Sequence, residues 1–149
     1  MISQCSAVKN LLNHFSALGS KEITTLIPIF FYLVDEKIIA TKIFIGLIIL
    51  YIIGIIIRLT YNKQRPQKRN NRENAFQIIE DNSFPSMHST RSTFILLMIC
   101  QYFNFEIKIS LFFSLIYITI LYARIHKKRH DYVDLIAGVI LGTIPFLIL

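Results

Sequence analysis

The sequence has 149 residues, of which 54% are hydrophobic, and its mean hydropathy of +0.53 is far above that of an ordinary soluble domain. This length predicts a single domain, residues 1–149. The formal net charge of +7 comes without a Gly-rich phosphate loop or a nucleic-acid module, so we expect no nucleic acid and favour anionic lipid as the partner. Cys5 and Cys100 are too few and too separated for a disulfide framework or a zinc site.

Residues 1–20 place apolar side chains at helical spacing with polar side chains between them. No uninterrupted apolar core precedes a cleavage site, so we do not expect this segment to be a signal peptide. We expect a helix that lies in the membrane interface, and a solvent-exposed cap helix is the alternative. The apolar positions are Ile2, Val8, Leu11, Leu12, Phe15 and Leu18.

Five charge-free apolar runs follow, and each is shorter than the roughly 20 residues that span a bilayer. If Lys42 and Lys108 extend outward to the head groups, Ile38–Ile57 and Ile107–Ala123 become long enough. We therefore predict an all-α, polytopic membrane helical bundle with about five transmembrane helices. A water-soluble all-α core is the alternative, but its helices would normally have a polar face. The runs are Ile23–Val34, which contains Pro28 and for which crossing is left open, Ile43–Ile57, Ser92–Phe105, Ile109–Ala123 and Leu135–Leu149.

The polar connections differ strongly in length and charge. If every run crosses, the N-terminus, residues 58–88 and residues 124–131 lie on one side, and most basic residues lie with them. Cytoplasmic loops collect Lys and Arg, which would explain the basicity by topology alone. Binding of an anionic head group would explain it equally well.

Arg58 closes one apolar run, and Arg65 follows seven residues later, directly before Pro66. Two guanidinium groups can bind the oxygens of one phosphate and offset the negative charge that grows during phosphoryl transfer. Taken alone, Arg58 could simply flank a membrane helix at the interface.

Pro85-Ser86-Met87-His88 has the composition of a helix start. The N–H groups at a helix start form an anion site, so Ser86 and the neighbouring amides, including that of Met87, can hold phosphate oxygens. His88 would then lie close enough to protonate a leaving group.

Arg124, His130 and Asp134 form the last polar cluster. If residues 130–134 are helical, His130 and Asp134 share one face, and the carboxylate can hold one ring nitrogen while the other attacks an electrophile. His126, His130 and Asp134 could alternatively bind zinc. Zinc binding would not explain Arg58, Arg65 and Arg124, so we predict no metal site.

These three motifs, in this order, resemble the signature of the type 2 phosphatidic acid phosphatase superfamily. The resemblance implies an in-line displacement without metal or cofactor, with His130 as nucleophile, Asp134 orienting its ring and His88 as general acid. It also implies that Arg58, Arg65, Ser86, Met87 and Arg124 surround the phosphate. The chain departs from the family at Arg58 (usually Lys), Met87 (usually Gly) and Ala123 (usually Ser). Members commonly have six membrane helices, and we expect residues 1–20 to stand in place of the first.

The implied function is an integral-membrane lipid phosphatase that hydrolyses a phosphomonoester or diphosphate through a phospho-histidine. A lipid-phosphate phosphotransferase and a non-enzymatic lipid-binding scaffold are the alternatives, whereas the related vanadium haloperoxidases are soluble. The sequence leaves open the substrate, which could be polyprenyl diphosphate, phosphatidic acid, phosphatidylglycerol phosphate or phosphorylated lipid A. A homo-oligomer or a partner subunit also stays open. We expect a bacterial inner (plasma) membrane location and favour an extracytoplasmic site, as in the family, although the basic loops favour the cytoplasm.

Overall fold

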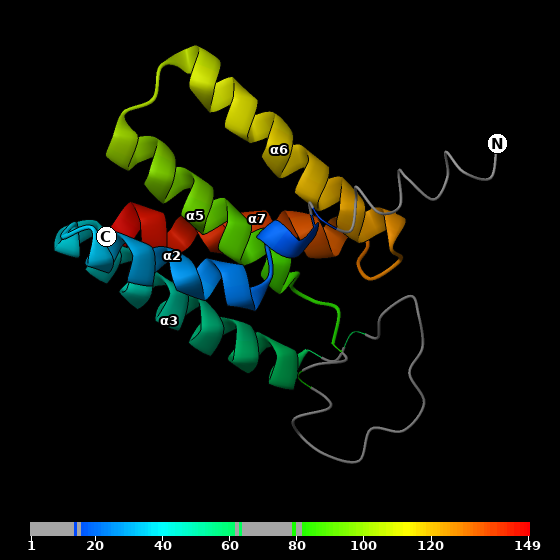
Figure 1. Ribbon diagram of the computed structural model, residues 1–149. Coiled ribbons are helices and arrows are strands. Elements are labelled where there is room, and N and C mark those ends of the chain that lie inside the picture. Colours follow the sequence, from blue (N-terminus) through cyan, green and yellow to red (C-terminus); the bar gives the residue numbers. More distant parts are fainter. Residues whose placement is uncertain (1–13, 15, 62, 64–78, 80–81) are drawn as a thin grey trace.

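The computed structural model describes residues 14, 16–61, 63, 79 and 82–149, and this part of the chain is all-α, as predicted (Figure 1). Each of the five predicted apolar runs is a helix. The interfacial helix expected over residues 1–20 lies largely outside the described residues. The helices are α2 (Lys21–Leu33), α3 (Lys37–Thr60), α5 (Met87–Phe103), α6 (Ile107–His126) and α7 (Tyr132–Ile148).

Among the described residues, α3 and α6 are long and apolar enough to cross a membrane, and α7 is a shorter apolar helix. Helix α2 has 13 residues, which corresponds to about 20 Å at 1.5 Å per residue and is less than the hydrocarbon thickness. Helix length therefore supports two crossings, and the larger number stays a prediction.

The outward faces of the long helices are apolar rather than polar. Phe44, Ile48 and Ile52 of α3 are exposed, as are Leu111 and Leu115 of α6. A water-soluble bundle would place polar side chains at such positions. The exposed surface thus favours a lipid environment over a soluble core.

Helices α5 and α7 pack at backbone distance because α7 has glycines one turn apart. A Cβ atom at Gly138 would lie 2.7 Å from the carbonyl oxygen of Ser86, and one at Gly142 would lie 2.4 Å from that of Thr90. Small residues four apart are the usual means of close helix contact in membranes. Ser89 Oγ also donates to the Leu135 carbonyl at 2.9 Å. The starts of α5 and α7 are therefore fixed against each other.

Helix α3 packs against another face of α5. The ring of Phe94 lies over Gly46, and the side chain of Met87 lies over Gly54. Ile43, Leu50 and Phe94 belong to the buried core beside this contact. The two glycines leave room for large side chains of α5, which draws the end of α3 towards the start of α5.

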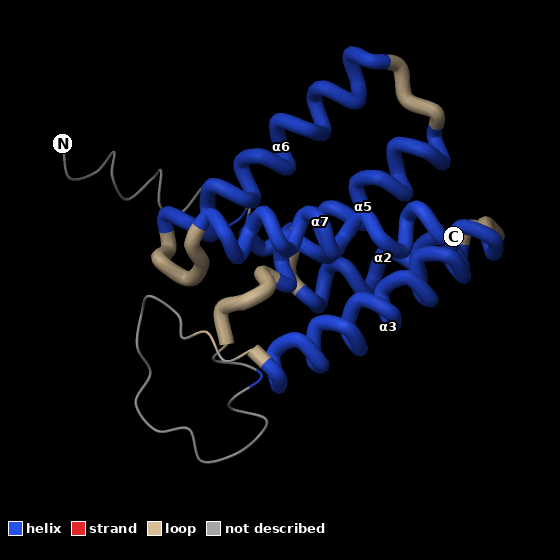
Figure 2. The backbone as a smooth tube through the Cα atoms, turned by 180° about the vertical axis from the view of Figure 1, so that it is seen from behind, coloured by secondary structure: helices blue, strands red, loops and turns tan. Residues whose placement is uncertain are grey.

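One end of the bundle, which we call the polar end, collects the end of α3, the start of α5, the end of α6 and the start of α7 (Figures 1 and 2). Figure 2 shows the α6–α7 loop and the segment before α5 side by side at this end. Hydrogen bonds join them, because His130 contacts Ser83 and the Ser86 amide donates to the Asp134 carbonyl at 3.0 Å. The described part of the connection before α5 therefore meets the α6–α7 loop, whereas a shared side of a membrane stays a prediction.

Candidate active site

Arg58 lies in the last turn of α3 and is buried. Its Nη1 atom donates to the carbonyl oxygen of Ile79 at 2.8 Å, and Nη2 donates to that of Pro85 at 3.0 Å. A side chain that only flanked a membrane helix would extend into the head groups instead. Arg58 therefore belongs to the interior of the polar end. Arg65, its predicted partner, lies outside the described residues.

Asn82 was not singled out by the sequence, yet it is fully buried. Its amide nitrogen donates to the carbonyl oxygens of Arg58 and Tyr61, the latter at 3.1 Å. These carbonyls lie at the end of α3, where the helix itself supplies no donor. Asn82 thus ties the end of α3 to the segment that precedes α5.

Ser86 is the N-cap of α5, so the predicted helix start is confirmed, and its hydroxyl accepts from the Ser89 amide at 3.4 Å. Its own amide is already bound to the Asp134 carbonyl. Met87 is buried with its sulfur over Gly54 of α3. The methionine side chain therefore fills space between α3 and α5, and the amide of Ser86 serves to join α5 to α7.

His88 lies in the first turn of α5 and is half-buried. Burial, together with the nearby charges of Arg124 and Arg91, lowers the pKa of His88 to about 2. The imidazole is therefore neutral in the unliganded protein. A bound phosphate dianion would offset the two arginines and favour protonation.

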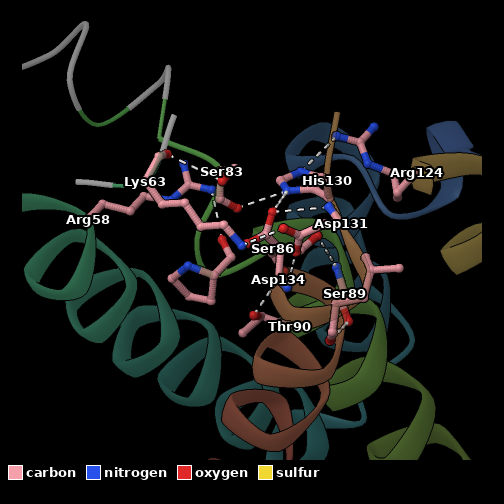
Figure 3. A network of polar contacts seen from close by, with 12 residues as sticks. Arg58, Lys63, Ser83, Ser86, Ser89, Thr90, Arg124, His130, Asp131 and Asp134 are labelled. Atoms are coloured by element: carbon pink, nitrogen blue, oxygen red, sulfur yellow. Dashed lines mark hydrogen bonds and ion pairs between the residues drawn. The ribbon is translucent and has the colours of Figure 1, made fainter. Parts of the chain in front are cut away.

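His130 is almost completely buried and lies in the loop before α7 (Figure 3). Its Nδ1 atom lies 2.8 Å from the carbonyl oxygen of Ser83 and 3.6 Å from Asp134 Oδ2. Its Nε2 atom lies 3.4 Å from Nη2 of Arg124. The contact between His130 and Asp134 is thus present, but the expected shared helix face is wrong, because Asp131 is the N-cap and α7 begins after it.

Asp134 is fully buried at the third position of α7. It forms a capping box with Asp131, in which the Asp134 amide donates to Asp131 Oδ1 at 2.9 Å and the Asp131 amide donates to Asp134 Oδ2 at 3.2 Å. Lys63 Nζ lies 2.8 Å from Asp134 Oδ1. Burial alone would raise the pKa of Asp134, but hydrogen bonds from His130 and Lys63 hold that pKa well below its usual range.

Arg124 lies in the last turn of α6 and is buried. Besides the contact with His130, its Nη1 atom donates to the hydroxyl of Ser16 at 3.2 Å. Ala123, which stands where the family usually has serine, is fully buried beside it. A hydroxyl from before α2 thus contacts the arginine, which no local sequence pattern could reveal.

The structure brings Arg58, Ser86, Arg124, His130 and Asp134 into one buried cluster at the polar end (Figure 3). His126 does not join it, since its ring is exposed and lies 6.1 Å from that of Tyr122. The set proposed for zinc is therefore not assembled. Within the described ranges, no group of three or more His, Cys, Asp or Glu residues is placed to hold a metal ion.

Buried arginines and a histidine are side chains of the kind that bind phosphate and attack phosphorus in other proteins. The sequence pattern of the PAP2 superfamily matches residues 39–149 of the chain. The fold is similar to that of the crystal structure of Aquifex aeolicus LpxE, with a TM-score of 0.76, 20% sequence identity, and coverage of 95% of this chain and 84% of that chain. No curated protein sequence matches the chain.

Proposed function

The chain belongs to the PAP2 superfamily, and from this premise we propose that it is an integral-membrane lipid phosphatase. Its substrate would be a phosphomonoester or diphosphate on a lipid head group, which suits a bundle with an apolar exterior and one polar end. The observation that best supports this function is the orientation of His130. Its Nδ1 atom is held by the Ser83 carbonyl while Nε2 faces the buried Arg124.

In the first step, the lone pair of Nε2 attacks phosphorus and forms a P–N bond while the P–O bond to the lipid breaks. Arg58, Arg65, Ser86 and Arg124 bind the non-bridging oxygens. His88 gives its proton to the departing oxygen. The Ser83 carbonyl and Asp134 then stabilise the positive charge on the His130 ring.

In the second step, water attacks the phosphorus of the phospho-histidine and the P–N bond breaks. Neutral His88 accepts a proton from that water and releases it to solvent once phosphate leaves, because the unliganded imidazole is neutral. Inorganic phosphate leaves, and the electron pair returns to Nε2 of His130. Apart from the attacking water, every group in this cycle belongs to the protein or to the substrate.

Phosphate release by purified protein in detergent and EDTA tests the function. We expect release from at least one of polyprenyl diphosphate, phosphatidic acid, phosphatidylglycerol phosphate and phosphorylated lipid A, and none from a His130→Ala variant. A labelled, acid-labile phosphoramidate should also be trapped on the protein. Neither release nor labelling with any of these lipids would favour the scaffold alternative. Transfer to an added lipid alcohol without phosphate release would favour the phosphotransferase.

A further inference from the structure

Lys63 follows the end of α3 and forms ion pairs with two carboxylates at the start of α7 (Figure 3). Its Nζ atom lies 2.6 Å from Asp131 Oδ2 and 2.8 Å from Asp134 Oδ1. The Lys63 side chain is 26% exposed, and that of Asp134 is completely buried. Burial opposes the charge on the lysine, but hydrogen bonds to the two aspartates raise the pKa of Lys63, so it remains charged.

Asp131 and Asp134 each use one carboxylate oxygen in the capping box and the other in the ion pair with Lys63. Asp131 Oδ1 and Asp134 Oδ2 accept the amides of the capping box, and the remaining oxygen of each accepts Lys63. Asp134 Oδ2 also faces Nδ1 of His130 at 3.6 Å. Because Lys63 holds Oδ1, the Asp134 carboxylate cannot rotate without losing an ion pair. Lys63 and the Asp131 amide thereby fix the orientation of the Asp134 carboxylate beside the histidine.

The main chain of Lys63 reaches the same histidine by a second route. Its carbonyl oxygen accepts the Ser83 amide at 2.9 Å and the Ser83 hydroxyl at 3.3 Å. The carbonyl of Ser83 in turn accepts from His130 Nδ1 at 2.8 Å. Among the described residues, the two acceptors near Nδ1 are therefore held by Lys63, one through its side chain and one through its backbone.

We propose that Lys63 is a positioning residue for the nucleophile, a role that rests on the proposed phosphatase activity. It places Asp134 and Ser83 around Nδ1, which keeps the proton there and directs the lone pair of Nε2 towards the phosphate site. Its positive charge also offsets the Asp134 carboxylate. This limits how strongly the carboxylate favours a protonated, non-nucleophilic ring before substrate binds.

The test compares Lys63→Met with Lys63→Arg and with the control Lys37→Met. Lys37 is exposed and pairs with Asp35 between α2 and α3, so it forms an ion pair away from the cluster. Steady-state kinetics on the lipid found above, the pH profile of kcat/KM, the rate of phospho-histidine formation and the melting temperature are measured for each purified variant in detergent.

We expect Lys63→Met to lower kcat by roughly 10–100-fold, the size of the loss found when partners that orient metal ligands are removed. Phospho-histidine formation should slow in parallel, KM should change little, and the acid limb of the pH profile should move to higher pH. Lys63→Arg should restore most of the rate, and Lys37→Met should behave as wild type. If Lys63→Met does not fold, Lys63→Gln keeps a donor without the charge, and the same shift of the acid limb is expected.

Suppose that the wild-type protein is active and that a folded Lys63→Met or Lys63→Gln variant keeps the normal rate and pH profile. This result would overturn the positioning role of Lys63 but would leave the proposed phosphatase function standing. A lower melting temperature with unchanged kcat and pH profile would show that Lys63 only stabilises the fold, which would also overturn its positioning role. Absence of phosphate release and of phospho-histidine in the wild-type protein would instead contradict the proposed function. The two failures are therefore distinguishable.

Discussion

His130 and Ser83 are joined by a 2.8 Å contact between ring Nδ1 and a main-chain carbonyl oxygen. A carbonyl only accepts, so Nδ1 carries the proton and the lone pair of the neutral ring lies on Nε2. Because the partner is main chain, substituting side chains around the ring does not remove it. This contact therefore underlies several of the expected results below.

Replacing His130 by alanine should abolish turnover, because it removes the attacking atom. We expect a fall in kcat of at least about 10³-fold, with a melting temperature close to that of the wild type. Phosphate release and phospho-histidine labelling are the measurements. A folded variant with near-normal release would exclude His130 as the nucleophile.

Asp134→Asn should be less severe than His130→Ala, because Ser83 still holds Nδ1. We expect a loss of activity of roughly 10–100-fold. The buried Lys63 contact loses a charged partner, so the melting temperature should fall as well. Comparing both variants on one substrate is the check, and an Asp134→Asn rate as low as that of His130→Ala would contradict the smaller, orienting role.

His88→Ala should slow the reaction of a substrate with a poor leaving group more than that of a substrate with an activated leaving group. A lipid alkoxide needs a proton as it departs, whereas nitrophenolate needs little, so only the first reaction loses the help of His88. Rates on a lipid phosphate and on nitrophenyl phosphate provide the comparison. Equal losses on both would show that His88 is not the general acid.

His88 should also make the unliganded protein sensitive to acid. The pKa of His88 is lowered in the folded state, so below pH 6.5 the unfolded chain binds a proton that the folded protein does not. The free energy of unfolding is therefore unaffected above the unfolded pKa of about 6.5 and falls as the pH drops below it. The slope should reach at most about 1.4 kcal/mol per pH unit. Melting temperatures between pH 7 and 5 should depend less on pH in His88→Gln, and the exposed His126→Gln should serve as the unchanged control.

Met87→Gly should lower the stability of the fold more than it lowers the catalytic rate. Glycine is what the family uses beside the phosphate, so the anion site itself should tolerate it. The buried methionine lies over Gly54, however, and its removal leaves a cavity between α3 and α5 that should cost about 2–5 kcal/mol. Melting temperature and rate per folded molecule are the readouts, and a stable variant with a large loss of rate would show that Met87 shapes the substrate pocket.

The side of the membrane on which the polar end lies can be decided by labelling. In a background lacking Cys5 and Cys100, Asn71→Cys marks the polar connection before α5 and Glu106→Cys marks the α5–α6 loop. Glu106 is preferable to Asn104, which has a left-handed φ of 46° that disfavours cysteine. An impermeant thiol reagent on intact cells should label position 71, and labelling at 106 alone would place the site in the cytoplasm.

Much of the fold could be predicted because the five apolar runs are uninterrupted, and each became a helix. The contact between His130 and Asp134 was predicted correctly, but their place on one helix face was wrong. Lys128 adopts a left-handed φ of 52° and Asp131 caps α7, so the chain turns before the helix starts. An aspartate three residues before another is a weaker sign of a capping box than the usual Ser/Thr and Glu pair.

Lys63, Ser83, Asn82 and Ser16 could not be assigned from sequence. Each acts through a partner far along the chain, such as Lys63 with Asp131 and Asp134 or Ser16 with Arg124. Hydrogen bonds between distant segments leave no periodicity in either segment. Only the packing of the helix ends reveals them.

The gathering of these helix ends at one end of the bundle has a consequence for the proposed lipid phosphatase activity. In a bilayer, an enzyme built in this way reaches head groups of a single leaflet, and the released phosphate enters the water on that same side. A substrate made in the opposite leaflet must first be moved across by another protein. Turnover in cells would then follow the rate of that transbilayer movement, while the rate in detergent, where every head group is accessible, would follow the chemistry at His130.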